Sequence, residues 1–267
     1  MKEIVISSIG LGLIGFLFAV MLSIADKKLT VKKDPILEKI LKILPGINCG
    51  ACGFSSCEAF AQNVLEKKSL FKGCLAGGKE VNEKLCNLLG LESPHTTKKK
   101  VIVKCSQTEP KKFSAEYRGV KSCALADLTQ TSLACKYGCL GFGDCEKVCK
   151  FGAIKIEKGL PVINYEKCVG CGECVKACPR NVLEIVEIKN DKLYWVGCNN
   201  PETAMQVKKV CDVGCIGCGL CTKVIPESPF YLEEALAKIC YKKIEDKNLD
   251  LALQRCPTKV IKKIDVS

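Results

Sequence analysis

The first hydrophobic segment of the chain is an uninterrupted apolar run from Ile4 to Ala25 that contains no charged residue. As a helix it would span about 33 Å at about 1.5 Å per residue, enough to cross the core of a bilayer. Four lysines follow within eight residues, at positions 27, 28, 32 and 33. Because positive charge marks the cytoplasmic side of a span, we expect a single-pass anchor in the cell membrane over residues 1–26. The N-terminus would lie outside and the rest of the chain in the cytoplasm.

A cleaved signal peptide is the alternative, since "SIA" at residues 23–25 resembles a cleavage site. The apolar run is too long for that reading, and its flanking charge lies at the wrong end. Small residues recur on one face of the helix, at Ser8, Gly12, Gly15, Ala19 and Ser23. They fit close packing against a partner helix, or simply the ordinary composition of such spans. The span has no ionisable residue, so this chain alone is not expected to conduct ions.

Helical periodicity follows the anchor. Asp34 and Pro35 are suited to the first positions of a helix, whose apolar face ends before Pro45. A second helix is predicted from the capping-box pair Ser55 and Glu58. Both belong to a small helical domain that we place at residues 27–95.

The C-terminal part reads as two further small domains, at residues 96–190 and 191–267. The polar segment "LESPHTTKKK" is typical of a linker, with His95 as a solvated residue, and the first of these domains would start near Val101. The segments "AIKI" and "LPVI" flank Gly159 and predict a β-hairpin. The expected class is therefore α+β, with a transmembrane helix, a helical four-cysteine domain and two ferredoxin-like modules.

Cysteine changes the picture most, with 22 residues in a chain of 267. Such a density indicates disulfides in a short secreted chain and metal binding in an intracellular one. The cytoplasmic orientation favours metal, and a single histidine argues against mixed Cys/His zinc sites. The helical domain contains four of these cysteines, which could bind zinc or, as we favour, a [4Fe–4S] cluster. They are Cys49, Cys52, Cys57 and Cys74.

The most specific motif is a C-x2-C-x2-C-x3-C-P run, typical of bacterial ferredoxins. It consists of Cys168, Cys171, Cys174, Cys178 and Pro179. An irregular earlier run consists of Cys135, Cys139, Cys145 and Cys149, followed by Lys150. In two-cluster ferredoxins the fourth cysteine of each run ligates the other cluster. We therefore expect one cluster on Cys135, Cys139, Cys145 and Cys178, and a second on Cys149, Cys168, Cys171 and Cys174.

A third run, "CIGCGLCTKVIP", has Ile225 where the fourth cysteine should be. The later segment "CPTKV", at residues 256–260, matches "CPRNV" of the complete run, so Cys256 would complete the cluster of this third run. Its expected ligands are Cys215, Cys218, Cys221 and Cys256. All ligands of the partner cluster are missing together, which predicts a one-cluster module with an apolar plug around Ile225.

Four clusters account for sixteen cysteines. Cys86 is expected to be a buried thiol and Cys240 a core helix residue. The other four are structural thiols or ligands of extra clusters: Cys105, Cys123, Cys198 and Cys211. The formal charge of +12 would fall to about +4 with four oxidised clusters at about −2 each. Counter-charge for clusters is thus favoured over nucleic-acid binding, because no basic helix or aromatic stacking pattern occurs.

No nucleotide-binding loop and no Cys/His nucleophile pair occurs, so the chain is expected to carry electrons between partners. The anchor, "GINCGACGFSSCEAF" with Cys74, and "CKYGCLGFGDC" leading into ferredoxin repeats together resemble the B-subunit family of Rnf complexes, the ion-translocating ferredoxin:NAD oxidoreductases. The resemblance covers nearly the whole chain. It implies an electron-relay subunit with no complete active site of its own. Its electrons would come from soluble reduced ferredoxin and pass towards membrane subunits with flavin and iron–sulfur groups, while the complex reduces NAD⁺ and pumps Na⁺ or H⁺.

Two other functions remain open at this point. The four-cysteine domain also resembles one in activators of corrinoid enzymes, so a membrane-tethered reductase of another redox enzyme is possible. The anchor and its small-residue face disfavour it. A non-redox scaffold with zinc on its cysteines is the other alternative, which metal analysis would separate.

Overall fold

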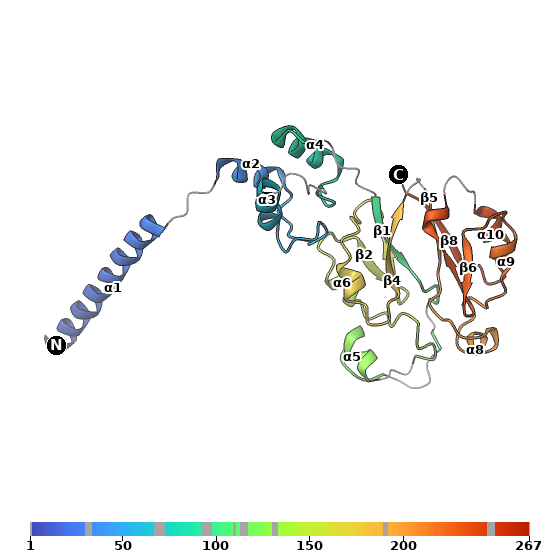
Figure 1. The fold of residues 1–267 in the computed structure, drawn as a ribbon. Helices are drawn as coiled ribbons and strands as arrows, with labels where there is room; N and C mark the ends of the chain where they lie inside the picture. Colours follow the sequence, from blue (N-terminus) through green and yellow to red (C-terminus); the bar gives the residue numbers. More distant parts are fainter. Residues whose placement is uncertain are drawn as a thin grey trace.

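The computed structural model describes residues 2–29, 34–66, 73–91, 98–108, 111–112, 117–129, 133–188, 192–244 and 249–266. Within this part the fold mixes helices and short antiparallel strand pairs (Figure 1). The α-helices are α1 (Lys2–Leu29), α2 (Pro35–Ile43), α3 (Cys57–Glu66), α4 (Gly78–Leu89), α5 (Cys123–Leu128), α6 (Asp144–Lys147), α7 (Glu173–Lys176), α8 (Ala204–Val210), α9 (Leu220–Lys223) and α10 (Asp250–Arg255). The strands are β1 (Lys98–Val103), β2 (Ile154–Glu157), β3 (Leu160–Ile163), β4 (Leu183–Ile188), β5 (Lys192–Val196), β6 (Phe230–Glu233), β7 (Leu236–Ile239) and β8 (Ile261–Asp265).

Helix α1 stands apart from the cysteine-rich domains (Figure 1). Its segment Ile9–Lys28 is long and apolar enough to cross a membrane, and none of it is buried in the protein. Leu11 and Met21, for example, are largely exposed. An exposed apolar surface of this size needs a nonpolar environment, which is consistent with the expected anchor.

Helices α2, α3 and α4 pack into the small helical domain around Ile40, Phe60 and Leu85. The predicted start of α2 is confirmed, because the Asp34 side chain accepts a hydrogen bond of 2.8 Å from the Ile36 amide. The predicted start of α3 is wrong by one residue. The Oγ atom of Ser56, rather than of Ser55, accepts the hydrogen bond from the third residue of the helix.

The eight described strands, β1 to β8, form two units with the same topology. In the first unit the outer strands β1 and β4 pair antiparallel and enclose the hairpin β2–β3. In the second, β5 and β8 pair around the hairpin β6–β7. The predicted hairpin at residues 153–163 is thus confirmed, and its turn uses left-handed backbone at Lys158 and Gly159.

The two units pack against each other through their outer strands. Ile102 and Val186 of the first share one buried cluster with Leu193 of the second. The indole Nε1 of Trp195 also donates a hydrogen bond of 3.0 Å to the carbonyl oxygen of Val103. Figure 1 accordingly shows the helical domain, the first unit and the second unit in one row.

Candidate metal centres

Three short helices present a cysteine in the same way. Helices α6, α7 and α9 each follow a glycine in left-handed conformation, at Gly143, Gly172 and Gly219, with φ of 82°, 86° and 70°. Only glycine adopts this backbone without strain. A buried cysteine is the second residue of each helix. These cysteines are Cys145, Cys174 and Cys221.

The first cavity lies in the helical domain, between α2, α3 and the segment before α4. It has a volume of about 350 Å³ and an otherwise mainly apolar lining that includes Phe54 and Phe60. The structure brings all four expected cysteines to it: Cys49, Cys52, Cys57 and Cys74. The Gly77 amide donates a hydrogen bond of 3.3 Å to the sulfur of Cys74. Burial raises the pKa of Cys74, and the thiols of the other three cysteines add to this effect.

A second group forms around α7. Burial raises the pKa of Cys174 to about 12, and the next contributions come from Cys168, Cys171 and Cys149, so these four sulfurs lie within electrostatic reach. The Ala153 amide donates a hydrogen bond of 3.3 Å to the sulfur of Cys149. This grouping matches the expected exchange of the fourth cysteine between the two halves of the module.

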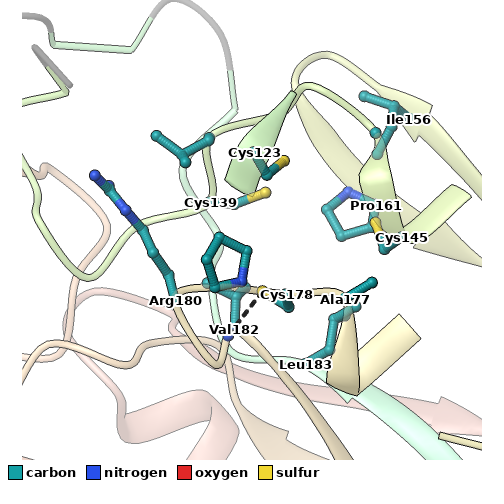
Figure 2. A pocket seen from close by; sticks show the side chains of 13 residues that line it. Cys123, Cys139, Cys145, Ile156, Pro161, Ala177, Cys178, Arg180, Val182 and Leu183 are labelled. Atoms are coloured by element: carbon teal, nitrogen blue, oxygen red, sulfur yellow. Dashed lines mark hydrogen bonds between the residues drawn. The ribbon is translucent and has the colours of Figure 1, made fainter. Parts of the chain in front are cut away.

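The third group departs from expectation. A cavity of about 390 Å³ between α5, α6 and the loop after α7 is lined by Cys123, Cys139, Cys145 and Cys178. Figure 2 shows these four side chains around one space, with apolar neighbours such as Leu183 and Pro161. Cys135, expected here, does not line the cavity, and Cys123 takes its place.

The reason is a shift in register that the spacing does contain. The cysteines at 139, 145 and 149 have the same separations, six and four residues, as those at 168, 174 and 178. In that alignment Phe142 stands where the complete run has Cys171, so one near ligand is missing. Cys135 lies outside the repeat, and the missing thiol must come from elsewhere.

Helix α5 supplies that thiol. The Oγ atom of Ser122 donates a hydrogen bond of 2.8 Å to the Asp144 side chain, which ties the start of α5 to the start of α6. Arg180 holds the end of α5 with a salt bridge of 2.7 Å to Asp127. Cys123 is the first residue of α5 and therefore faces the cavity beside α6.

The fourth group lies in the second unit. A cavity of about 350 Å³ is lined by all four expected cysteines: Cys215, Cys218, Cys221 and Cys256. The Ala237 amide donates to the sulfur of Cys215 at 3.5 Å. Cys218 alone among the 22 cysteines is exposed, so this group approaches the protein surface more closely than the others.

The neighbouring half of the second unit is filled by apolar side chains. Ala252 is fully buried and stands four residues before Cys256. In the complete run the equivalent position, four residues before Cys178, is occupied by Cys174. Leu249 is also fully buried, and Ile225 packs against the same core. Apolar residues therefore occupy the region where a second cluster would sit in a two-cluster module.

Comparison with known proteins agrees with this arrangement. The family model described as "Putative Fe-S cluster" matches residues 44–76, and the model of a 4Fe-4S binding domain matches residues 161–184. The B subunit of the ion-translocating oxidoreductase complex of Methanosarcina acetivorans is 36% identical over 98% of this chain and 99% of its own length. The chain belongs to the Rnf B-subunit family.

Two further family members are also 36% identical. They are named as the B subunits of the proton-translocating ferredoxin:NAD(+) oxidoreductase complex of Clostridium ljungdahlii and of the Na(+)-translocating complex of Acetobacterium woodii. The first match covers 99% of this chain and 94% of the relative, and the second covers 87% and 70%.

The four groups of this Rnf-type chain fit a cluster better than a single ion. Among the described residues, no set of three or more His, Cys, Asp or Glu side chains is arranged to hold a metal ion. Thiolates on one zinc ion would lie about 3.8 Å apart, given Zn–S bonds of about 2.3 Å, whereas a four-iron cube keeps its ligands farther apart. None of the 22 cysteines forms a disulfide. Buried thiols such as Cys139 and Cys145, with pKa raised to about 12, need a cationic core to become thiolates.

Six cysteines lie outside the four groups. Cys86 is buried in α4, as expected. Cys240 was expected in a core helix, but it is half-buried after β7, just before the 3₁₀ turn Tyr241–Lys243. The other four, Cys105, Cys135, Cys198 and Cys211, gather between the two units. His95 lies outside the described residues.

Proposed function

We propose that this chain is the membrane-anchored electron relay of an Rnf-type complex. It accepts electrons from soluble reduced ferredoxin and passes them to membrane subunits that carry flavin and iron–sulfur groups, on the way to NAD⁺. The complex couples this transfer to movement of Na⁺ or H⁺. The support is membership of the Rnf B-subunit family, together with the order in which the cysteine groups lie along the protein.

That order is the observation on which the proposal rests most. The thiol of Cys171 lies within electrostatic reach of Cys49, which joins the helical domain to the first unit. The thiol of Cys145 in turn lies within electrostatic reach of Cys174, and this contact joins the two groups of the first unit. The group of the helical domain and the two groups of the first unit therefore follow one another in series.

The direction of flow follows from the ends of the series. The helical domain follows the anchor, and the second unit lies at the opposite end of the row (Figure 1). Exposed Cys218 belongs to that far unit. We place ferredoxin docking at the second unit and electron exit at the helical domain, with all cluster domains in the cytoplasm and the N-terminus of α1 outside the cell.

Each group is assigned one [4Fe–4S] cluster. The ligand sets are Cys49, Cys52, Cys57 and Cys74; Cys149, Cys168, Cys171 and Cys174; Cys123, Cys139, Cys145 and Cys178; and Cys215, Cys218, Cys221 and Cys256. These residues bind and orient the clusters, and the apolar linings exclude water from them.

The test is anaerobic iron, sulfide and zinc analysis of the full chain in detergent, followed by reduction with reduced ferredoxin and EPR. Four clusters correspond to about sixteen irons with magnetically coupled S = 1/2 signals. Cys256→Ser should remove about four of them, and Cys240→Ser none. Zinc with little iron, or no reduction by ferredoxin, would refute the relay.

A further inference from the structure

Four cysteines that belong to none of the four groups come from equivalent places in the two units. Cys105 and Cys198 each follow the first outer strand of their unit by two residues, after β1 and β5. Cys135 and Cys211 each stand four residues before a cavity cysteine of their unit, Cys139 or Cys215, in "CKYGC" and "CDVGC". Each unit therefore contributes one matching pair.

The strand ends bring the first members of these pairs together. The Oγ atom of Ser106 donates a hydrogen bond of 3.0 Å to the carbonyl oxygen of Gly197. These residues are the direct neighbours of Cys105 and Cys198. The hydrogen bond of Trp195 to the Val103 carbonyl supports the same crossing of strands.

Lys112 joins the second members. Its carbonyl oxygen accepts a hydrogen bond of 2.9 Å from the Ala134 amide, next to Cys135. Its Nζ atom forms a salt bridge of 2.6 Å with Asp212, next to Cys211. Both loops are thus fixed to the same residue.

Asn200 connects the strand end to the loop of the other unit. Asn200 stands two residues after Cys198 and is almost fully buried. Its Nδ2 atom lies 3.7 Å from the sulfur of Cys135. A salt bridge of 3.0 Å between Lys136 and Glu202 closes the same junction. The carboxylates at the junction are therefore engaged with lysines.

The sulfurs themselves interact. Cys135, Cys198 and Cys211 are buried, and Cys105 is half-buried. The thiol of Cys135 lies within electrostatic reach of Cys105, and the thiol of Cys211 lies within reach of both. The thiol of Cys198 lies within reach of Cys135. These four thiols, none of which forms a disulfide, match the number of cysteines that a [4Fe–4S] cluster requires.

We propose that Cys105, Cys135, Cys198 and Cys211 hold a fifth [4Fe–4S] cluster, built half from each unit. The site extends the proposed relay and rests on it. Cys105 also lies within reach of Cys139, and Cys198 within reach of Cys215. The fifth site therefore stands between the last group of the first unit and the group of the second. One electron enters it as the neighbouring cluster is oxidised and leaves as the next is reduced, so no bond forms or breaks.

The experiment counts metal in the anaerobically purified full chain in detergent. With the fifth site the protein should contain about twenty irons and little zinc. Cys105→Ser and Cys211→Ser, one from each unit, should each lower the count to about sixteen. Retention of these irons also shows that the variants are folded. Cys240→Ser, outside every group, is the control and should keep about twenty.

A kinetic readout separates a relay from a structural metal. After rapid mixing with reduced ferredoxin, the two serine variants should show slower reduction of the first unit, while the second unit is reduced at the normal rate. About sixteen irons in the wild type, or one zinc that both serine variants lose, would overturn the fifth cluster and leave the four-cluster relay intact. Failure of the relay itself looks different, because then the wild type holds zinc and little iron throughout.

Discussion

The Nζ atom of Lys150 donates a hydrogen bond of 2.9 Å to the carbonyl oxygen of Asn48, the residue before Cys49. Lys150 follows Cys149 at the position where the complete run has Pro179. The departure from the ferredoxin pattern thus provides a contact between the helical domain and the first unit. It lies beside the approach of Cys49 to Cys171, where the proposed relay leaves the first unit.

Lys150→Ala should weaken this contact without disturbing a cluster. An exposed hydrogen bond of this kind contributes about 1 kcal/mol, so the equilibrium constant for docking of the two domains should fall about fivefold. The rate of electron transfer into the helical domain should fall by up to the same factor. Rapid-mixing reduction by ferredoxin measures the rate, and iron content should be unchanged. Lys155→Ala, at an exposed lysine on β2, is the control. Equal rates in all three proteins would show that Lys150 does not hold the domains together.

Cys123→Ser tests the ligand that α5 supplies. Loss of one thiolate should destabilise the cluster in the cavity of Figure 2 and remove about four irons. Anaerobic iron analysis with EPR measures this loss, and Cys240→Ser serves as the matched control. An unchanged iron content in Cys123→Ser would mean that a residue other than Cys123 is the fourth ligand of this cluster.

Cys123 lines this cavity in place of the expected Cys135. The sequence did not predict this replacement, and it has a physical cause. The complete run keeps its ligands local in the chain, so Cys168, Cys171 and Cys174 could be grouped from spacing alone. Cys123 reaches its cavity only because Ser122 and Arg180 fix α5 against α6, and a tertiary contact of this kind leaves no periodic signal.

Other parts of the fold were accessible from the sequence because each depends on local chemistry. The cap at Asp34 and the hairpin turn at Gly159 follow from side-chain and backbone preferences within a few residues. The junction of Cys105 with Cys198 does not, since it depends on how β1 and β5 cross. The repeated "CKYGC" and "CDVGC" segments were the available hint.

Ile225→Ala tests the apolar plug of the second unit. The side chain packs against the core that contains Leu249 and Ala252, so truncation should lower the free energy of unfolding by about 2 kcal/mol. Iron content should remain the same, because no ligand is removed. Chemical denaturation followed by circular dichroism under anaerobic conditions measures the stability. Ile225→Cys is the companion variant, and it should add no iron; a gain of iron would mean that this half of the unit retains a cluster site.

Lys111 is a buried cation beside the third group, and its removal should lower the reduction potential there. Its Nζ atom donates hydrogen bonds to the carbonyl oxygens of Cys139 and Gly159, and its charge acts on the Cys139 thiol. A positive charge favours the more negative, reduced cluster. Loss of about 1 kcal/mol of this interaction corresponds to a decrease on the order of 50 mV for a one-electron couple.

Lys111→Met is the variant, and EPR-monitored redox titration gives the potential. Lys111→Arg, which keeps the charge, should stay close to the wild type, and this separates charge from packing. The Cys49 group lies in a different domain, so its potential should be the same in both variants. An equal decrease in Lys111→Arg would attribute the effect to lost hydrogen bonds at the Cys139 loop, and an unchanged potential in Lys111→Met would show that solvent screens the lysine from the cluster.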